Sequence, residues 1–106
     1  MAWVILAVAV VTEIIWALSL KWAQVQQTFA AAAVPIGLSF VNMWLLSLAM
    51  KGISAGTAYA IWTGLGAVGV IIGGAILFGE RVGTVQMLFM AMIVCGVVGT
   101  KLFAQS

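Results

Sequence analysis

The chain has 106 residues, of which 66% are hydrophobic and only 6% are charged. A soluble domain of this size needs far more polar surface, so the composition excludes one and predicts an integral membrane protein. The net charge of +2 is too small and too scattered for a nucleic-acid surface. One cysteine and no histidine exclude an intramolecular disulfide and the usual cysteine and histidine metal sites.

Four apolar runs are separated by three polar breaks, and each run is close to the ~20 residues that a helix needs to cross a bilayer. The runs cover approximately residues 2–20, 30–50, 57–78 and 85–103. Backbone amides in lipid must be satisfied within the chain, so all four runs are predicted to be helices. We therefore expect an all-α membrane protein in which residues 1–106 form a single four-helix transmembrane domain.

The first run contains Glu13, the most informative residue of the chain. An ionised side chain at membrane depth costs about 2.5–3.5 kcal/mol on insertion scales, so an acid there is a candidate functional residue. Val10 and Trp16 lie three positions before and after it on the same helical stripe. This stripe of an acid, a large aromatic ring and small neighbours predicts one wall of a cation pocket.

The second run carries Ser39 and, one turn later, Asn42 near its midpoint. An amide at such depth needs a hydrogen-bond partner, and a substrate, Glu13 or another helix would each serve. A plain helix-to-helix hydrogen bond is an equally good interpretation of Asn42, because intramembrane amides commonly join helices.

The third run places a phenol, an indole and a hydroxyl at positions i, i+3 and i+4 of one helix face, namely Tyr59, Trp62 and Thr63. Aromatic faces attract cations and a phenol can bind a carboxylate, so this stripe matches Glu13 chemically. The alternative is an aromatic belt at the membrane interface. Trp62 lies deeper than such a belt, which favours the first interpretation.

Glycines in the last two runs suggest two further roles. Gly64, Gly66 and Gly69 follow the aromatic stripe and predict a bend, where a helix can differ between two conformational states. The fourth run carries Gly96 and Gly99, and small residues let helices approach closely in lipid. We expect the fourth helix to form the seam of a dimer.

The charges in the polar segments favour neither orientation in the membrane. With four spans, Lys51 and Lys101 fall on one side, and Lys21 and Arg81 fall on the other. The positive-inside rule has almost nothing to act on, which motivates the hypothesis that the chain inserts both ways and that opposite copies pair. Such a dimer would place two Glu13 carboxylates in one shared chamber, which a single four-helix protomer has little room to form.

Two motifs resemble those of the small multidrug resistance family, and the resemblance covers essentially the whole chain. They are Glu-Ile-Ile-Trp-Ala at 13–17 and Gly-Thr-Ala-Tyr-Ala-Ile-Trp-Thr-Gly-Leu-Gly at 56–66. The chain length, the four spans and the solitary membrane glutamate agree with this resemblance. Within the family, three residues are more similar to the guanidinium-exporter branch than to the branch that exports quaternary ammonium drugs: Trp16, Thr63 and Lys101.

The resemblance implies an antiparallel, dual-topology homodimer in the bacterial inner membrane, without a cofactor. It implies export of guanidinium or small substituted guanidinium cations, which compete with protons for the paired Glu13 carboxylates. Tyr59 and Trp62 would line the site, and Trp16 would help to orient Glu13. Two positions depart from the branch and leave the substrate open, because Val10 stands where a glycine is usual and Asn42 where a serine is usual.

Other functions remain as alternatives. A broader exporter would bind quaternary ammonium ions, which have no N–H donor and rely on aromatic faces and apolar area. A small membrane adaptor would instead pair Glu13 with a basic residue of a larger partner, and a heterodimer with a paralogue is also open. Enzymatic catalysis has the least support, because no nucleophile, metal cluster or cofactor motif accompanies the acid.

Overall fold

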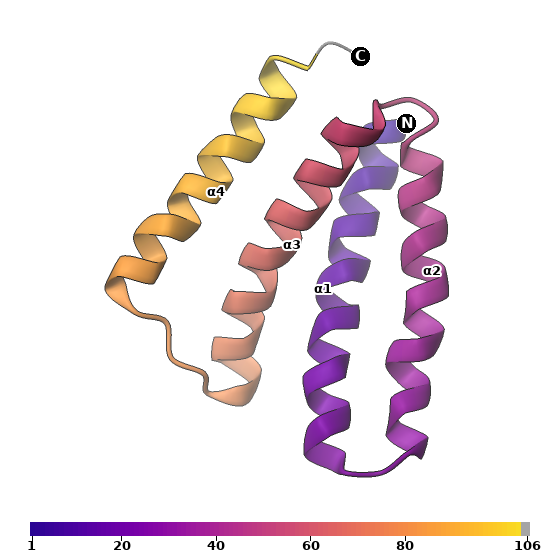
Figure 1. Ribbon diagram of the computed structural model, residues 1–106, viewed down its shortest axis with the longest axis vertical. Coiled ribbons are helices and arrows are strands. Elements are labelled where there is room, and N and C mark those ends of the chain that lie inside the picture. Colours follow the sequence, from indigo (N-terminus) through magenta and orange to yellow (C-terminus); the bar gives the residue numbers. More distant parts are fainter. Residues whose placement is uncertain (105–106) are drawn as a thin grey trace.

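The computed structural model describes residues 1–104 and consists of four long helices connected by short loops (Figure 1). In chain order these are α1 (Ala2–Gln26), the short 3₁₀ helix η1 (Ala30–Ala32), α2 (Ala33–Ala49), α3 (Ala55–Phe78) and α4 (Thr84–Leu102). With η1 and α2 counted as one span, four helices are long and apolar enough to cross a membrane. The predicted all-α fold with four spans is confirmed. Residues 105 and 106 of the predicted domain lie outside the described residues.

The first helix continues to Gln26, past the end that we predicted at residue 20. The additional segment is more polar but contains no glycine or proline, and its lysine and glutamines are good helix formers. The helix ends at Gln27, which has a left-handed backbone with φ of 56° and donates its N–H to the Ala23 carbonyl. Polarity therefore marks where the chain leaves the hydrocarbon, whereas the backbone of Gln27 marks where the helix ends.

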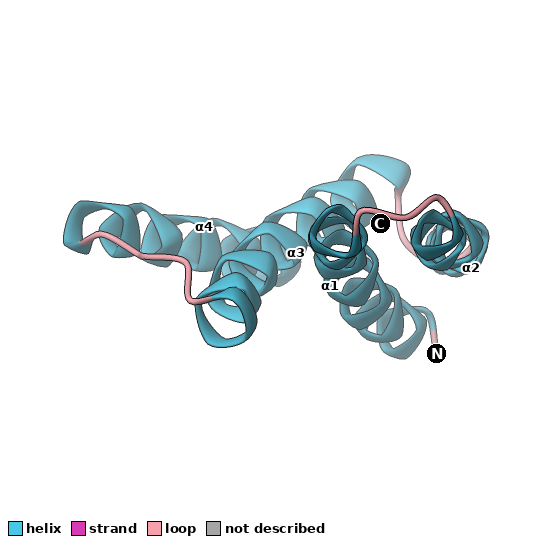
Figure 2. Cartoon of the chain, turned by 90° about the horizontal axis from the view of Figure 1, so that it is seen from below, coloured by secondary structure: helices cyan, strands magenta, loops and turns pink. Residues whose placement is uncertain are grey.

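The protomer is thin, and α1 lies at its centre. Helix α1 packs against both α2 and α3, whereas α4 packs mainly against α3 and meets α1 through Lys101, which lies over the Trp3 ring (Figures 1 and 2). No residue of α4 is buried. The fourth helix therefore leaves most of its apolar surface to lipid or to another chain.

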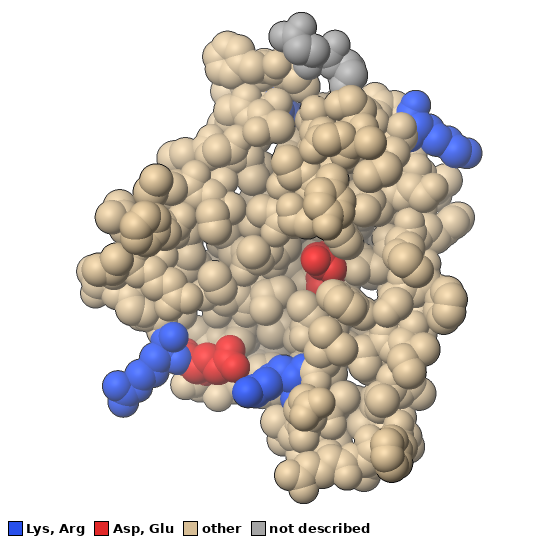
Figure 3. All heavy atoms as spheres, viewed as in Figure 1, with Lys and Arg blue, Asp and Glu red and all other residues tan. Residues whose placement is uncertain are grey.

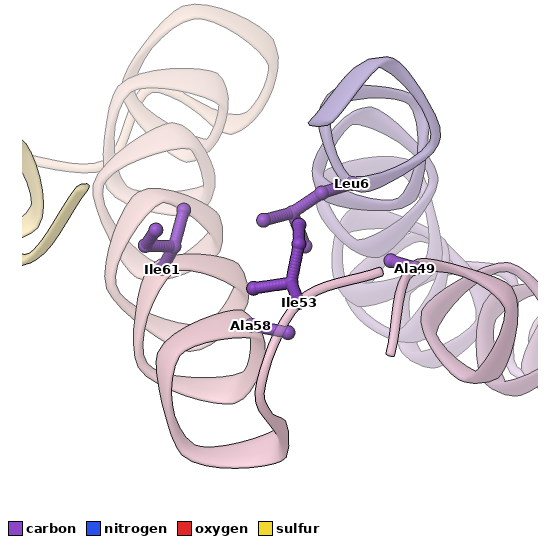
Figure 4. Close-up of a cluster of buried hydrophobic side chains, with 5 residues drawn as sticks. All are labelled: Leu6, Ala49, Ile53, Ala58 and Ile61. Atoms are coloured by element: carbon purple, nitrogen blue, oxygen red, sulfur yellow. The ribbon is translucent and has the colours of Figure 1, made fainter. Parts of the chain in front are cut away.

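The hydrophobic core is small and lies at the end of the protomer that holds the N-terminus. It joins α1, the end of α2, the loop that follows and the first half of α3 through five buried side chains (Figure 4): Leu6, Ala49, Ile53, Ala58 and Ile61. This cluster packs α1 against α3 at one end of the helices. The polar contacts of α1, such as that of Glu13, lie outside the cluster, nearer the middle of the helix.

Three glycines of α3 allow α1 to approach closely. A Cβ atom added at each would overlap one side chain of α1: Gly66 with Glu13, Gly69 with Ile14, and Gly73 with Leu18. At Gly66 the added Cβ would lie 2.7 Å from the Glu13 Cγ. Gly64 faces α4 instead, where its Cβ would meet Val97 at 2.8 Å. Helix α3 is continuous through these glycines, so they serve packing here, and the bend at Gly64, Gly66 and Gly69 stays a prediction.

Candidate functional site

The Glu13 carboxylate lies in the middle of α1, between α2 and α3. Its Oε1 accepts a hydrogen bond of 2.9 Å from the Asn42 Nδ2 of α2, and its Cγ lies against Gly66 of α3. One acidic side chain is isolated in the middle of an uncharged face in Figure 3, whereas the basic side chains gather toward the ends. The fold thus holds a carboxylate at mid-membrane depth through contacts from two neighbouring helices.

Asn42 is the most deeply buried polar residue at the site, with 4% of its surface exposed. Its Nδ2 donates to Glu13, which is one of the three partners that the sequence left open. Its Oδ1 is buried and has no hydrogen-bond partner among the residues that the structure describes. The amide is therefore satisfied at one end only.

Trp16 is fixed one turn from Glu13 by a chain of two hydrogen bonds. Its Nε1 donates to the Ser39 Oγ at 2.9 Å, and that hydroxyl donates to the Pro35 carbonyl at 2.9 Å. The indole N–H is therefore engaged with α2 and does not bind the Glu13 carboxylate. Because its N–H group is used, only the face of the Trp16 ring remains available to the site.

The aromatic stripe of α3 meets α1 through Trp62. Its Nε1 donates to the Ala9 carbonyl at 3.3 Å, one turn before Glu13. Tyr59 packs against Trp62 with ring centroids 5.6 Å apart and planes tilted by 43°, and it is half exposed. The Thr63 hydroxyl donates to the Tyr59 carbonyl at 2.8 Å, so it serves its own helix rather than Glu13.

Val10 and the glycines of α4 lie away from the Glu13–Asn42 contact. Val10 is buried and lines an apolar crevice of about 570 Å³ between α1, α3 and α4. Lys101 lies in the wall of the same crevice, with its Nζ 5.2 Å from the centroid of the Trp3 ring. Apart from the neighbouring backbone of α4 itself, no described atom lies within 4 Å of a Cβ built at Gly96 or Gly99, so both are open for contact with another chain.

Some contacts of the site could not be read from the sequence. The bond from Trp62 to a backbone carbonyl leaves no pattern in the residues. The packing of α1 on α3 did leave one, because Gly66, Gly69 and Gly73 repeat at the spacing of one helix face, and the sequence analysis missed Gly73. The second acid of the chain, Glu80, is away from the site and pairs with Lys21 at 3.5 Å.

Comparison with known proteins identifies the family. A family model described as Small Multidrug Resistance protein matches residues 1–93. The chain belongs to the small multidrug resistance family. The guanidinium exporter of Proteus vulgaris is 49% identical over 102 residues, which cover 96% of this chain and 98% of that protein.

Two further members of the family are similar over nearly their whole length. The guanidinium exporter of Salmonella typhimurium is 42% identical over 104 residues, covering 98% of this chain and 99% of that protein. The guanidinium exporter of Escherichia coli K12 is 40% identical over 102 residues, covering 96% and 97%. Together with the four spans, membership of this family makes the chain a multi-pass transporter of the bacterial inner membrane and not an enzyme.

Proposed function

We propose that this small multidrug resistance protein exports guanidinium or small substituted guanidinium cations in exchange for protons, and that both ligands compete for Glu13. The observation that carries the proposal is the position of that carboxylate. Among the described residues it is the only acid inside the four helices, and α2 and α3 hold it in place. The names of the three relatives, which are 40–49% identical, support guanidinium as the cation.

The chemistry of the carboxylate suits a planar cation that carries N–H groups. Among residues 1–104, only Asn42 donates a hydrogen bond to Glu13, and it does so at Oε1. The remaining lone pairs can accept N–H groups from guanidinium, which presents parallel donors to a carboxylate. A proton neutralises the same carboxylate and removes its attraction for a cation. Guanidinium affinity is therefore expected to fall as the pH is lowered.

We also propose that two copies pair in opposite orientations, with α4 at the seam. Helix α4 has no buried residue, and its Gly96 and Gly99 are open. The balance of lysine and arginine between the two sides supports insertion in both directions. Reporters fused to the C-terminus should be found on both sides of the membrane. A reporter found on one side alone would refute the dual topology.

Transport into liposomes tests the exchange. Purified protein is reconstituted, a proton gradient is applied, and guanidinium movement is recorded for the wild type, Glu13→Gln and Glu80→Gln. The last variant is the matched control, because it makes the same chemical change to the half-exposed acid outside the helices. We expect Glu13→Gln to abolish proton-coupled exchange and Glu80→Gln to retain it. Coupled exchange that persists in Glu13→Gln would rule out the mechanism.

The Tyr59–Trp62 pair favours one second candidate, a broader exporter that includes quaternary ammonium ions. Adjacent aromatic faces bind cations that have no N–H group. Competition binding separates the two candidates. Displacement by guanidinium but not by a tetraalkylammonium ion supports the first, and the reverse supports the second. Failure of both ions to bind a stable, folded homodimer would instead favour a membrane adaptor.

A further inference from the structure

Asn42 places an unpaired acceptor beside the Glu13 carboxylate. Its Nδ2 is bonded to Glu13 at 2.9 Å, whereas its Oδ1 is buried and bonded to none of the described residues. A buried acceptor without a donor is unfavourable, so such an atom in a folded protein calls for an explanation. Because both atoms belong to one amide, the unpaired Oδ1 lies next to the carboxylate that would bind the cation.

The orientation of this amide follows from the charge of its partner. An ionised carboxylate has only acceptors, so the NH₂ group of Asn42 must face it and the carbonyl is left without a donor. A protonated Glu13 differs, because an acid and an amide can exchange two hydrogen bonds, one in each direction. The shortage of a donor therefore arises in the ionised state, which is the state that binds a cation.

The protein itself does not supply the missing donor within the described residues. The Trp16 Nε1 donates to Ser39, and the Trp62 Nε1 donates to the Ala9 carbonyl. The Thr63 hydroxyl donates within its own helix. The Trp16, Trp62 and Thr63 donors are thus engaged elsewhere, and a ligand that brings N–H groups can provide the donor that Oδ1 lacks.

We propose that the Asn42 Oδ1 binds substrate by accepting a second N–H group from a cation that is held at Glu13. The inference rests on the proposed function, which places the cation at that carboxylate. It defines the substrate class as planar cations with at least two N–H groups. A quaternary ammonium ion cannot make this contact.

A ratio of two affinities isolates the contact. Binding to the purified full-length protein is measured by calorimetry at one fixed pH for guanidinium and for pentamethylguanidinium, which keeps a single N–H group. A hydrogen bond from a charged donor is worth about tenfold or more in affinity, so the wild type should prefer guanidinium by about that factor. Asn42→Leu, which removes both polar atoms at similar volume, should lower this ratio by the same factor.

The ratio removes the other effect of the substitution. Asn42→Leu also deletes the hydrogen bond to Glu13, but both ligands need Glu13, so that loss cancels. Ser47→Ala, at an exposed position of α2, is the matched control and should keep the wild-type ratio. Circular dichroism and gel filtration check folding. If Asn42→Leu does not fold, Asn42→Ser, which keeps a hydroxyl but lacks the amide carbonyl, should lower the ratio in the same way.

The outcomes for the inference and for the proposed function are distinct. Equal weakening of both ligands in the Asn42 variants, or no preference in the wild type, would overturn the role of Oδ1 and leave the function intact. Such a result is expected if a donor from a second copy of the chain, rather than the cation, bonds to Oδ1. Guanidinium binding that is unchanged in Glu13→Gln would overturn the proposed function itself, whatever the ratio.

Discussion

Substitution of Gly66 by alanine should displace Glu13 and weaken cation binding. The new Cβ would lie 2.7 Å from the Glu13 Cγ, whereas ordinary contact begins at 3.4 Å, so the side chain must move by about 0.7 Å. Because Glu13 lies between α3 and α2, a displacement of that size away from Gly66 changes the position of the carboxylate relative to Asn42 and disturbs their 2.9 Å hydrogen bond. Overpacking of this kind costs about 1–3 kcal/mol, or about five- to 150-fold when it appears as lost affinity.

Guanidinium titration of purified Gly66→Ala measures this loss, and its thermal midpoint in detergent measures stability. The matched control is Gly37→Ala in α2, because no atom lies within 4 Å of its added Cβ. That control should bind as the wild type does and should be no less stable, since alanine favours a helix by up to about 1 kcal/mol over glycine. The reasoning is refuted if Gly66→Ala binds guanidinium with wild-type affinity.

Three further predictions concern contacts around the site. Trp16→Phe and Ser39→Ala each break the same 2.9 Å hydrogen bond, so thermal unfolding of the single and double variants should give a coupling free energy of about 1 kcal/mol between the two residues. Additive losses of stability would contradict the hydrogen bond. Gly99→Leu fills an open position of α4 and should shift cross-linked dimer toward monomer while α1 to α3 stay folded; an unchanged dimer fraction would exclude this seam. Lys21→Met removes a half-exposed ion pair with Glu80, so it should lower stability by less than about 1 kcal/mol and leave guanidinium affinity unchanged. A large loss of affinity would show that this end of α1 contributes to cation binding.

The sequence was sufficient to predict the four helices and to select Glu13 as the residue on which the proposed site is built. Apolar length defines a span, and the cost of a charge in lipid singles out Glu13. The end of α1 at Gln26 was not predictable in this way, because hydropathy reports the membrane boundary and a polar segment can remain helical beyond it.

The contacts of the site were harder to predict, because helical spacing shows which residues share a face but not which face meets which neighbour. Asn42 had three possible partners until the rotation of α2 against α1 placed it on Glu13. The target of Trp62 is a backbone carbonyl, which every residue possesses, so the sequence carries no signal for it. The contact of Gly66 with α1 was accessible, since its spacing from Gly69 marks one face of α3.

The hydrogen bonds of the site explain why a proton and guanidinium would compete for it. Each indole or amide donor described beside Glu13 already has an acceptor: Trp16 bonds to Ser39, Trp62 bonds to Ala9, and Asn42 bonds to Glu13. What remains is a surplus of acceptors, namely the free lone pairs of the carboxylate and the Asn42 Oδ1. A proton supplies one donor and removes the charge, whereas guanidinium supplies several donors and balances the charge. Under the proposed function both ligands would meet the same deficit, so binding of one would remove the reason for the other to bind.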